Sequence, residues 1–436
     1  MMKKFIQWAL TGTILLTAMQ TAQALDIKSW TTSKGVKVLF VETHALPVID
    51  ATLTFKAGSS RDGDLHGISS LVNGLLVEGT GDLSAEQVAE GFESTGAELK
   101  HDSLRDMATI GLRSLSDRKL LDPVVDLFSR VVALPSFSQQ AIERDRRAML
   151  VALANGEKDV STVTQKAFYA ALYKGHPYAI GSGGTASALK KITRKDLLRF
   201  HQNYYVAKNA NLSLVGDFTL AQAKQYAEKL TAKLKPGQPA KPIKTALAPS
   251  KGNTTHIKFD TTQTHILQGM PEMKRNDPDY YALYLGNHIL GGSGFSSRLM
   301  KKIRVERGLV YSVYSYFIPM ESNGPFQMGL GTRNAKAEEA GQLMDDVLRD
   351  FIKNGPSDAE IDHAKKNITG GFALKIDSNK KIAEYLSVIG FYNLPLDYLD
   401  TFNDRIMAVS ADQIRDAFKR RVQPDSMIRV VVGPVS

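Results

Sequence analysis

Residues 290–314 read LGGSGFSSRLMKKIRVERGLVYSVY, and this stretch combines three local signals. After a glycine-rich turn, the pattern predicts a helix that continues to about Glu306 and then turns at Gly308 into a strand. One face of that strand is predicted to carry Val310, Ser312 and Tyr314. The stretch is therefore expected to form a helix, a turn and a strand, so that side chains from two elements can meet.

Arg304 and Tyr311 lie on either side of Gly308, and the predicted turn brings the guanidinium and the phenol towards one spot. An arginine offers a planar fork of donors, and a tyrosine offers a single hydroxyl donor. Such donors suit a peptide carbonyl, or the oxyanion that forms from it during cleavage. The alternative is structural: a salt-bridged surface arginine beside a half-buried strand tyrosine.

The composition is that of an ordinary globular protein. The 436 residues are enough for two domains with separate cores, and 43% of them are hydrophobic and 23% charged. The net charge of +10 is spread in short clusters, without a basic tail or an aromatic-interleaved basic motif. No nucleic-acid role is therefore expected, whereas acidic peptides or an acidic partner are compatible with this charge.

The N-terminus has the pattern of an export signal. Two lysines precede an apolar run that ends at about Met19, and Ala22 and Ala24 form a small-x-small cleavage site. A membrane anchor is the alternative, but the run is short and is interrupted by Thr-Gly-Thr at residues 11–13. We therefore expect a signal peptide at residues 1–24, cleavage near Ala24, a periplasmic location and no stable membrane insertion afterwards.

The first half of the chain has the pattern of strands mixed with capped helices. Val48 to Lys56 alternates as a strand, and an amphipathic helix follows at about Ile68 to Leu76. Ser84 opens a capping box for the next helix, and Asp122 as an N-cap predicts a helix from Pro123 to Val132. Strands that come in pairs before and between helices predict an α+β fold, with helices packed on a mixed sheet.

Residues 233–252 contain four prolines together with Lys, Gly and Ser, which is typical of a linker. The linker divides an N-terminal domain at residues 25–232 from a C-terminal domain at residues 253–436. Helix N-caps, apolar helix faces and strand-ending glycines recur 217 residues apart, at Thr193 and Ser410, Leu197 and Ile414, and Gly216 and Gly433. A repeat of this length indicates a duplicated domain.

Residues 57–80 read AGSSRDGDLHGISSLVNGLLVEGT, and residues 290–314 contain a Gly-rich turn, Ser-Arg-Leu and Gly-Leu-x-Tyr in that order. In these motifs the chain resembles insulinase and pitrilysin-like metallopeptidases, especially the mitochondrial processing peptidase branch. The resemblance spans essentially all of the chain after the leader. It implies two homologous α/β domains that are joined by a linker and face each other like a clamshell, around a cavity large enough for a peptide.

The resemblance also implies where zinc would bind. The family carries His-x-x-Glu-His on a helix, followed about 76 residues later by a Glu ligand. Counting back from the Gly-Thr at residues 79–80, the two histidine positions hold Ser70 and Gly74, and the general-base position holds Asn73. The downstream carboxylate should fall near Val151 or Ala152. All positions lack a ligand, so no metal is expected on this chain.

No other residues replace the missing ligands. The chain has no cysteine and no His-x3-His pair, which excludes thiolate sites and a helical histidine pair. His66 lies one turn before the motif but has no companion ligand there. Glu98 and His101 are three residues apart in a stretch with strand and turn patterns, and strand geometry points their side chains to opposite faces.

Processing-peptidase-like pairs, according to the resemblance, combine a zinc-binding subunit with a zinc-free one that keeps the Arg and Tyr. This chain is therefore predicted to be the substrate-binding, zinc-free subunit of a periplasmic heterodimeric metallopeptidase, with zinc on a homologous partner. Arg304 would clamp a carbonyl of a peptide or unfolded protein, and Tyr311 would stabilise the oxyanion. The alternatives are a catalytically inactive peptide-binding or scaffolding module, and an autonomous peptidase with a relocated metal.

Overall fold

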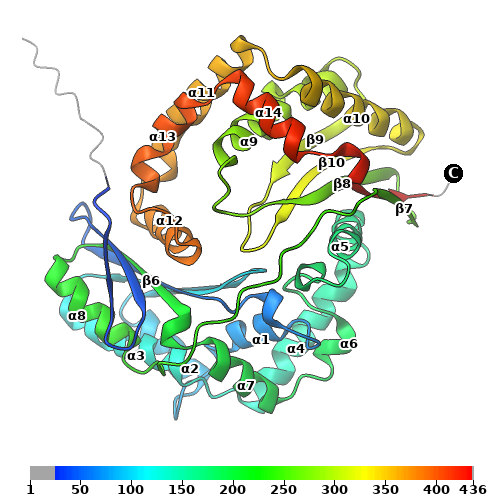
Figure 1. The fold of residues 1–436 in the computed structure, drawn as a ribbon. Helices are drawn as coiled ribbons and strands as arrows, with labels where there is room; N and C mark the ends of the chain where they lie inside the picture. Colours follow the sequence, from blue (N-terminus) through cyan, green and yellow to red (C-terminus); the bar gives the residue numbers. More distant parts are fainter. Residues whose placement is uncertain (1–24, 435–436) are drawn as a thin grey trace, which may run out of the picture.

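A computed structural model describes residues 25–434, which form two α+β halves that face each other like a clamshell (Figure 1). The predicted signal peptide at residues 1–24 lies outside the described residues. Within the described part, no helix combines the length and apolar character that crossing a membrane requires.

The N-terminal half is built on a six-stranded mixed sheet. In spatial order its strands are β1 (Lys28–Thr31), β2 (Lys37–Glu42), β6 (Ala210–Gly216), β3 (Val48–Phe55), β5 (Ala108–Leu115) and β4 (Glu98–Ser103). Its helices are α1 (Ile68–Leu75), α2 (Ala85–Glu93), α3 (Arg118–Ala133), α4 (Gln139–Gly156), α5 (Val160–Leu172), α6 (Ala186–Leu189), α7 (Arg194–Tyr204) and α8 (Leu220–Thr231).

The C-terminal half is built on a five-stranded sheet. In spatial order its strands are β7 (Asn253–Lys258), β11 (Ile428–Gly433), β8 (Gln263–Met273), β10 (Gly324–Arg333) and β9 (Val310–Phe317). Its helices are α9 (Tyr280–Asn287), α10 (Ala337–Asn354), α11 (Asp358–Phe372), α12 (Asn379–Tyr392), α13 (Tyr398–Ala408) and α14 (Ala411–Arg421). Residues 233–252, between the two sheets, contain neither helix nor strand.

The two sheets repeat one pairing scheme. The parallel pair β2 and β6 corresponds to β7 and β11, and three antiparallel pairings follow in each sheet to the edge strands β4 and β9. Thr193 and Ser410 open α7 and α14 with capping boxes, and Gly216 and Gly433 end β6 and β11. The α+β fold with two homologous halves is therefore confirmed.

One helix of each half packs on the sheet of the other half. Helix α12 of the C-terminal half packs on β2, β3 and β6, while α5 of the N-terminal half packs on β8 and β11 (Figure 1). Alternation along β2 explains this, since Phe40 belongs to the core of its own half while Leu39 and Val41 belong to the cluster that contains α12. Both faces of each sheet are therefore covered in part, one of them by the other half.

A buried carboxylate connects the halves at their junction. Asp106, in the β4–β5 turn, accepts hydrogen bonds from the hydroxyls of Tyr178 (2.5 Å) and Tyr392 (3.0 Å) and from the backbone amide of Glu321 (2.7 Å). Tyr392 and Glu321 belong to the C-terminal half. The Tyr178 hydroxyl in turn accepts from the amide of Ser322 at 3.0 Å. This network joins the two halves by hydrogen bonds in addition to their apolar packing.

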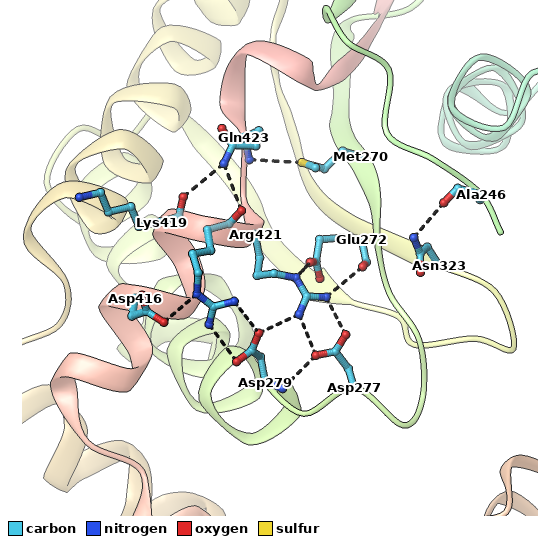
Figure 2. Close-up of polar contacts among 11 residues, drawn as sticks. Ala246, Met270, Glu272, Asp277, Asp279, Asn323, Asp416, Lys419, Arg421 and Gln423 are labelled. Carbon is cyan, nitrogen blue, oxygen red and sulfur yellow. Dashed lines mark hydrogen bonds and ion pairs between the residues drawn. The ribbon is translucent and has the colours of Figure 1, made fainter.

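A second polar network anchors the end of α14 (Figure 2). Arg421 donates to Glu272 at the end of β8 (2.6 Å) and to Asp277 (2.6 Å) and Asp279 (2.8 Å) before α9. Burial raises the pKa of Glu272 to about 7, although Arg421 opposes that shift. The network ties α14 to the segment that leads into α9 and the candidate site.

The helix predicted from Pro123 begins five residues earlier than expected, at Arg118. Asp117, not Asp122, is the N-cap of α3, and it accepts from the amide of Lys119 at 2.8 Å. Pro123 is tolerated inside the helix because it lies on the exposed side, where water can satisfy the carbonyl left without a donor. Asp122 instead binds Lys229 of α8 at 2.7 Å, a tertiary contact that no local pattern reveals.

Candidate functional site

Arg304 and Tyr311 meet at the edge of the C-terminal sheet. Arg304 lies in a short π-helix, η6 (Met300–Val305), and Tyr311 lies in β9. Gly308 turns the chain between them with a φ of 62°, a left-handed conformation that favours glycine. The guanidinium carbon of Arg304 lies 4.9 Å from the centre of the Tyr311 ring. The structure thus brings the two predicted residues together, while their role stays a prediction.

The orientation of Tyr311 depends on a bulge in β9. The register with β10 shifts between Val310 and Ser312, so that Tyr311 is an extra residue without a partner of its own. Val310 and Val313 are both buried in the core, and Tyr311 is 78% exposed. The predicted regular alternation of Val310, Ser312 and Tyr314 on one face is therefore wrong, because the bulge turns Val310 inwards.

Arg304 contacts a second aromatic ring. Its guanidinium carbon lies 4.7 Å from the centre of Phe295, a residue of the glycine-rich turn that is 66% exposed. The neighbouring carboxylate of Glu306 is bound by Lys302 at 3.0 Å. Within residues 25–434, Arg304 is held by ring contacts and by no ion pair. Its donors are therefore available to a ligand at an exposed aromatic surface.

The vacant zinc motif lies on α1, where the substituted residues make internal hydrogen bonds. Ser70 donates its hydroxyl to the carbonyl of Ser182 at 2.7 Å. Asn73 is buried and donates its amide to the carbonyl of Thr109 at 3.1 Å and to the hydroxyl of Tyr205 at 3.3 Å. An amide in these contacts acts as a structural donor and cannot act as a general base.

The space beside Gly74 contains a carboxylate that is already part of an ion pair. The nearest atom to a Cβ at Gly74 would be a carboxylate oxygen of Asp145 on α4, at 3.8 Å. Arg144 binds both Asp145 (2.8 Å) and Glu78 (2.7 Å). Hydrogen bonds to these two carboxylates raise the pKa of Arg144, with Glu78 the larger cause. A guanidinium thus already balances the nearby negative charge.

The remaining predicted positions do not supply ligands either. Val151 is 60% exposed on α4, and Ala152 beside it is exposed as well. Glu98 and His101 are exposed on the edge strand β4. Among the residues that the structure describes, no three His, Cys, Asp or Glu side chains are grouped to hold a metal. The side chains at these positions therefore do not fit a zinc ion.

A cavity of about 860 Å³ lies between the halves, bounded by β3, β4, β5 and α12. Its lining is charged, with Glu98, Lys100 and Asp102 from β4 and with Lys380 and Glu384 from α12. The size suits a segment of peptide, and β4 is an edge strand whose outer backbone groups can pair with an extended chain.

Comparison with known proteins shows the family. Residues 37–186 match the insulinase family, peptidase family M16, and residues 191–368 match the domain described as the peptidase M16 inactive domain. The chain therefore belongs to the insulinase (M16) family, and the resemblance noted in its sequence is confirmed. Because Ser70, Asn73 and Gly74 occupy the motif, it is a peptidase-fold protein without the zinc ligands of that family.

Individual relatives cover nearly the whole chain. The crystal structure of a peptidase M16 inactive domain from Pseudomonas fluorescens is 37% identical, with a TM-score of 0.91, over 94% of this chain and 99% of that one. The non-peptidase homolog YmxG of Helicobacter pylori is 28% identical over 99% of both chains. The crystal structure of a protease from Helicobacter pylori has a TM-score of 0.86 at 20% identity, over 94% of this chain and 100% of that one, which shows the fold alone.

Two features of the site were missed in the sequence. Phe295 lies within the glycine-rich turn, and the only sequence feature that could have indicated its contact with Arg304 is that it is an isolated aromatic residue there. The ion pairs of Arg144 with Glu78 and Asp145 join α4 to the end of α1, and no local sequence pattern predicts such a contact.

Proposed function

We propose that this chain is the zinc-free, substrate-binding subunit of a heterodimeric periplasmic metallopeptidase. A homologous partner would hold zinc, and this chain would bind peptides or unfolded segments of protein. The proposal rests on one observation above the others: Arg304 and Tyr311 meet on an exposed surface although the zinc motif on α1 has no ligand.

The chemistry of the pair supports a role in handling peptide carbonyls. Arg304 offers a planar set of donors whose position is fixed by Phe295 and Tyr311. Tyr311 offers a hydroxyl donor on a ring that the β-bulge directs outwards. Together they would hold a substrate carbonyl and stabilise the oxyanion that forms during hydrolysis. The chain would therefore contribute to cleavage without its own metal.

The test is reconstitution. The chain would be assayed alone, and then mixed with a homologue from the same organism that carries intact His-x-x-Glu-His, using an unfolded peptide and measuring zinc in each subunit. Cleavage in the mixture alone, with zinc on the homologue, is the expected result. Full cleavage by the homologue alone, with no complex and no gain on mixing, would contradict the proposal.

One observation favours a second function. The cavity of about 860 Å³ between the halves is complete within this single chain. A catalytically inactive module that binds peptides or scaffolds an envelope complex needs only that cavity. In the reconstitution experiment, peptide binding by the isolated chain without any gain in cleavage on mixing would favour this function over the first.

A further inference from the structure

A second cavity, of about 470 Å³, lies next to the vacant zinc motif. It is bounded by the end of α4, by α5 and by the loop at residues 179–186, which contains Gly181-Ser182-Gly183-Gly184. The loop is fixed to α1 through the hydrogen bond from Ser70 to the carbonyl of Ser182, at 2.7 Å. Gly184 also packs closely on the turn before α1, where a Cβ would lie 2.3 Å from the carbonyl oxygen of His66.

Arg105 lines this cavity, and none of the ion pairs among residues 25–434 includes its guanidinium. Its guanidinium carbon lies 3.7 Å from the centre of the Tyr169 ring, and its Nε donates to the carbonyl of Tyr178 at 3.3 Å. Within residues 25–434, no acceptor is recorded for its two terminal nitrogens. The adjacent carboxylate of Asp106 is already bound by Tyr178 and Tyr392. Burial lowers the pKa of Arg105, although the nearby tyrosines and the carboxylate of Asp106 oppose that shift.

The glycine-rich loop adds backbone donors. The amides of Gly181, Ser182 and Gly183 have no recorded acceptor among the described residues, whereas Gly184 donates to Gly181 at 3.0 Å. One terminal nitrogen of Arg105 lies 3.5 Å from the point where a Cβ at Gly181 would be. Consecutive free amides beside an oriented guanidinium are the donors that an anion requires.

We propose that this cavity binds a carboxylate of a peptide, with Arg105 and the amides of residues 181–183 as donors. The proposal rests on the peptide-binding part of the proposed function and names the group that is recognised. A planar carboxylate matches the fork of one guanidinium. Lys166 adds positive charge to the lining and Glu157 adds negative charge, so a singly charged carboxylate suits the cavity better than a phosphate dianion.

The experiment compares three fluorescent peptides that differ in one carboxylate. The first is penta-alanine with an amidated C-terminus, the second has a free C-terminus, and the third is amidated with a central glutamate. Binding to the isolated full chain would be measured by fluorescence anisotropy. We expect tighter binding of the peptides that carry a carboxylate, and the stronger of these two identifies the source of the carboxylate.

The decisive variant is Arg105→Gln. It should weaken binding of the carboxylate peptides by about tenfold or more and leave the amidated penta-alanine unchanged. Gly181→Ala is a second variant, because its methyl group would meet Arg105 at an ordinary contact distance of 3.5 Å and should hinder the ligand without unfolding the loop. Arg147→Gln, at an exposed arginine of α4, is the control for net charge.

Several outcomes would overturn the proposal. Equal binding of all three peptides would remove the carboxylate site while leaving peptide binding intact. Unchanged binding in both Arg105→Gln and Gly181→Ala would exclude this cavity, and inorganic phosphate bound in preference to the carboxylates would assign it to another anion. Failure of all three peptides to bind would also overturn it, and the separate reconstitution assay would then show whether the subunit function stands.

Discussion

Two of the vacant positions of the zinc motif, Ser70 and Asn73, have structural hydrogen-bond partners. Ser70 binds the loop carbonyl of Ser182, and Asn73 joins α1 to β5 and to Tyr205. A buried amide with satisfied donors stabilises its surroundings, whereas a carboxylate there would lose water and face a carbonyl. These residues therefore stabilise the fold, and replacing them with zinc ligands should lower the free energy of unfolding.

The triple variant Ser70→His, Asn73→Glu and Gly74→His should fail to bind zinc stoichiometrically. Val151 and Ala152 supply no carboxylate, and Arg144 places a positive charge beside the site. Metal analysis of the purified variant after dialysis is the measurement. Wild-type protein treated in the same way is the control, and one zinc per variant chain would show that the first helix is sufficient.

Tyr311→Phe should reduce turnover of the reconstituted pair by about a hundred- to a thousandfold, the range for loss of one oxyanion donor. The ring contact with Arg304 at 4.9 Å survives this change, so the effect reports on the hydroxyl. Turnover of an unfolded peptide and thermal unfolding of the chain would be measured together. Tyr316→Phe, at another exposed tyrosine of β9, is the control. Wild-type turnover in Tyr311→Phe would exclude the hydroxyl from the reaction.

His201 should make the fold sensitive to acid. It is buried, its Nε2 lies 2.8 Å from the carbonyl of Val132, and burial lowers its pKa to about 4. In the unfolded chain this histidine is protonated below about pH 6.5. In the folded chain it stays neutral until the pH falls to about 4. Its contribution to stability is therefore complete above about pH 6.5 and is lost as the pH falls towards 4, by about 3 kcal/mol.

His201→Gln keeps a donor for the carbonyl of Val132 and removes the titration. Urea unfolding at several values between pH 4 and pH 7 should show a shallower loss of unfolding free energy in the variant than in the wild type. His256→Gln, at an exposed histidine of β7, should keep the wild-type slope. An unchanged slope in His201→Gln would assign the acid sensitivity to other groups.

Elements with strong local signals were predictable from the sequence. The alternation from Val48 and the capping box at Ser84 gave β3 and α2 within a residue or two, because each signal lies inside the element that it specifies. The bulge at Tyr311 was not predictable, because the register of β9 depends on its pairing with β10. The true start of α3 was missed because Asp122 pairs with Lys229, far along the chain.

Helix α12 is an element whose stability comes from the opposite half. Its Leu386 is fully buried in the cluster that includes Leu39 and Val215, and Ser387 is hydrogen-bonded to Ser213 of β6 at 3.1 Å. Leu386→Ala should lower the unfolding free energy by about 2–5 kcal/mol, the usual cost of such a cavity. Glu384→Ala, on the exposed face of α12, should change it by less than about 0.5 kcal/mol. Equal effects in denaturant titrations would mean that the packing of α12 contributes little.

At the scale of the whole molecule, the duplication was predictable and the packing of one helix on the sheet of the other half was not. Features recurring 217 residues apart were enough to indicate two homologous halves. That α5 and α12 cross to the other sheet depends on which sheet faces remain uncovered, and this is decided by tertiary packing. The pair of Arg304 and Tyr311 was predicted from local spacing together with the family resemblance. Arg105 could be recognised only from the fold, which stacks it on Tyr169 without an ion pair among the described residues.

The junction at Asp106 should make the two halves unfold together. Asp106→Ala would leave the hydroxyls of Tyr178 and Tyr392 and the amide of Glu321 without their acceptor in a buried region, at a cost of about 3 kcal/mol or more. Because these donors come from both halves, the loss weakens the coupling between the halves as well as the stability of each. Calorimetry should show one transition in the wild type and a lower, broadened or divided transition in the variant.

Asp102→Ala is the matched control for that experiment. Asp102 lies on the same hairpin and is exposed, and among residues 25–434 its carboxylate accepts only from the adjacent amide of Ser103. Its variant should therefore keep the wild-type transition. A single, unshifted transition in Asp106→Ala would mean that helices α5 and α12 hold the halves together without the buried carboxylate, and the coupling would then belong to apolar packing alone.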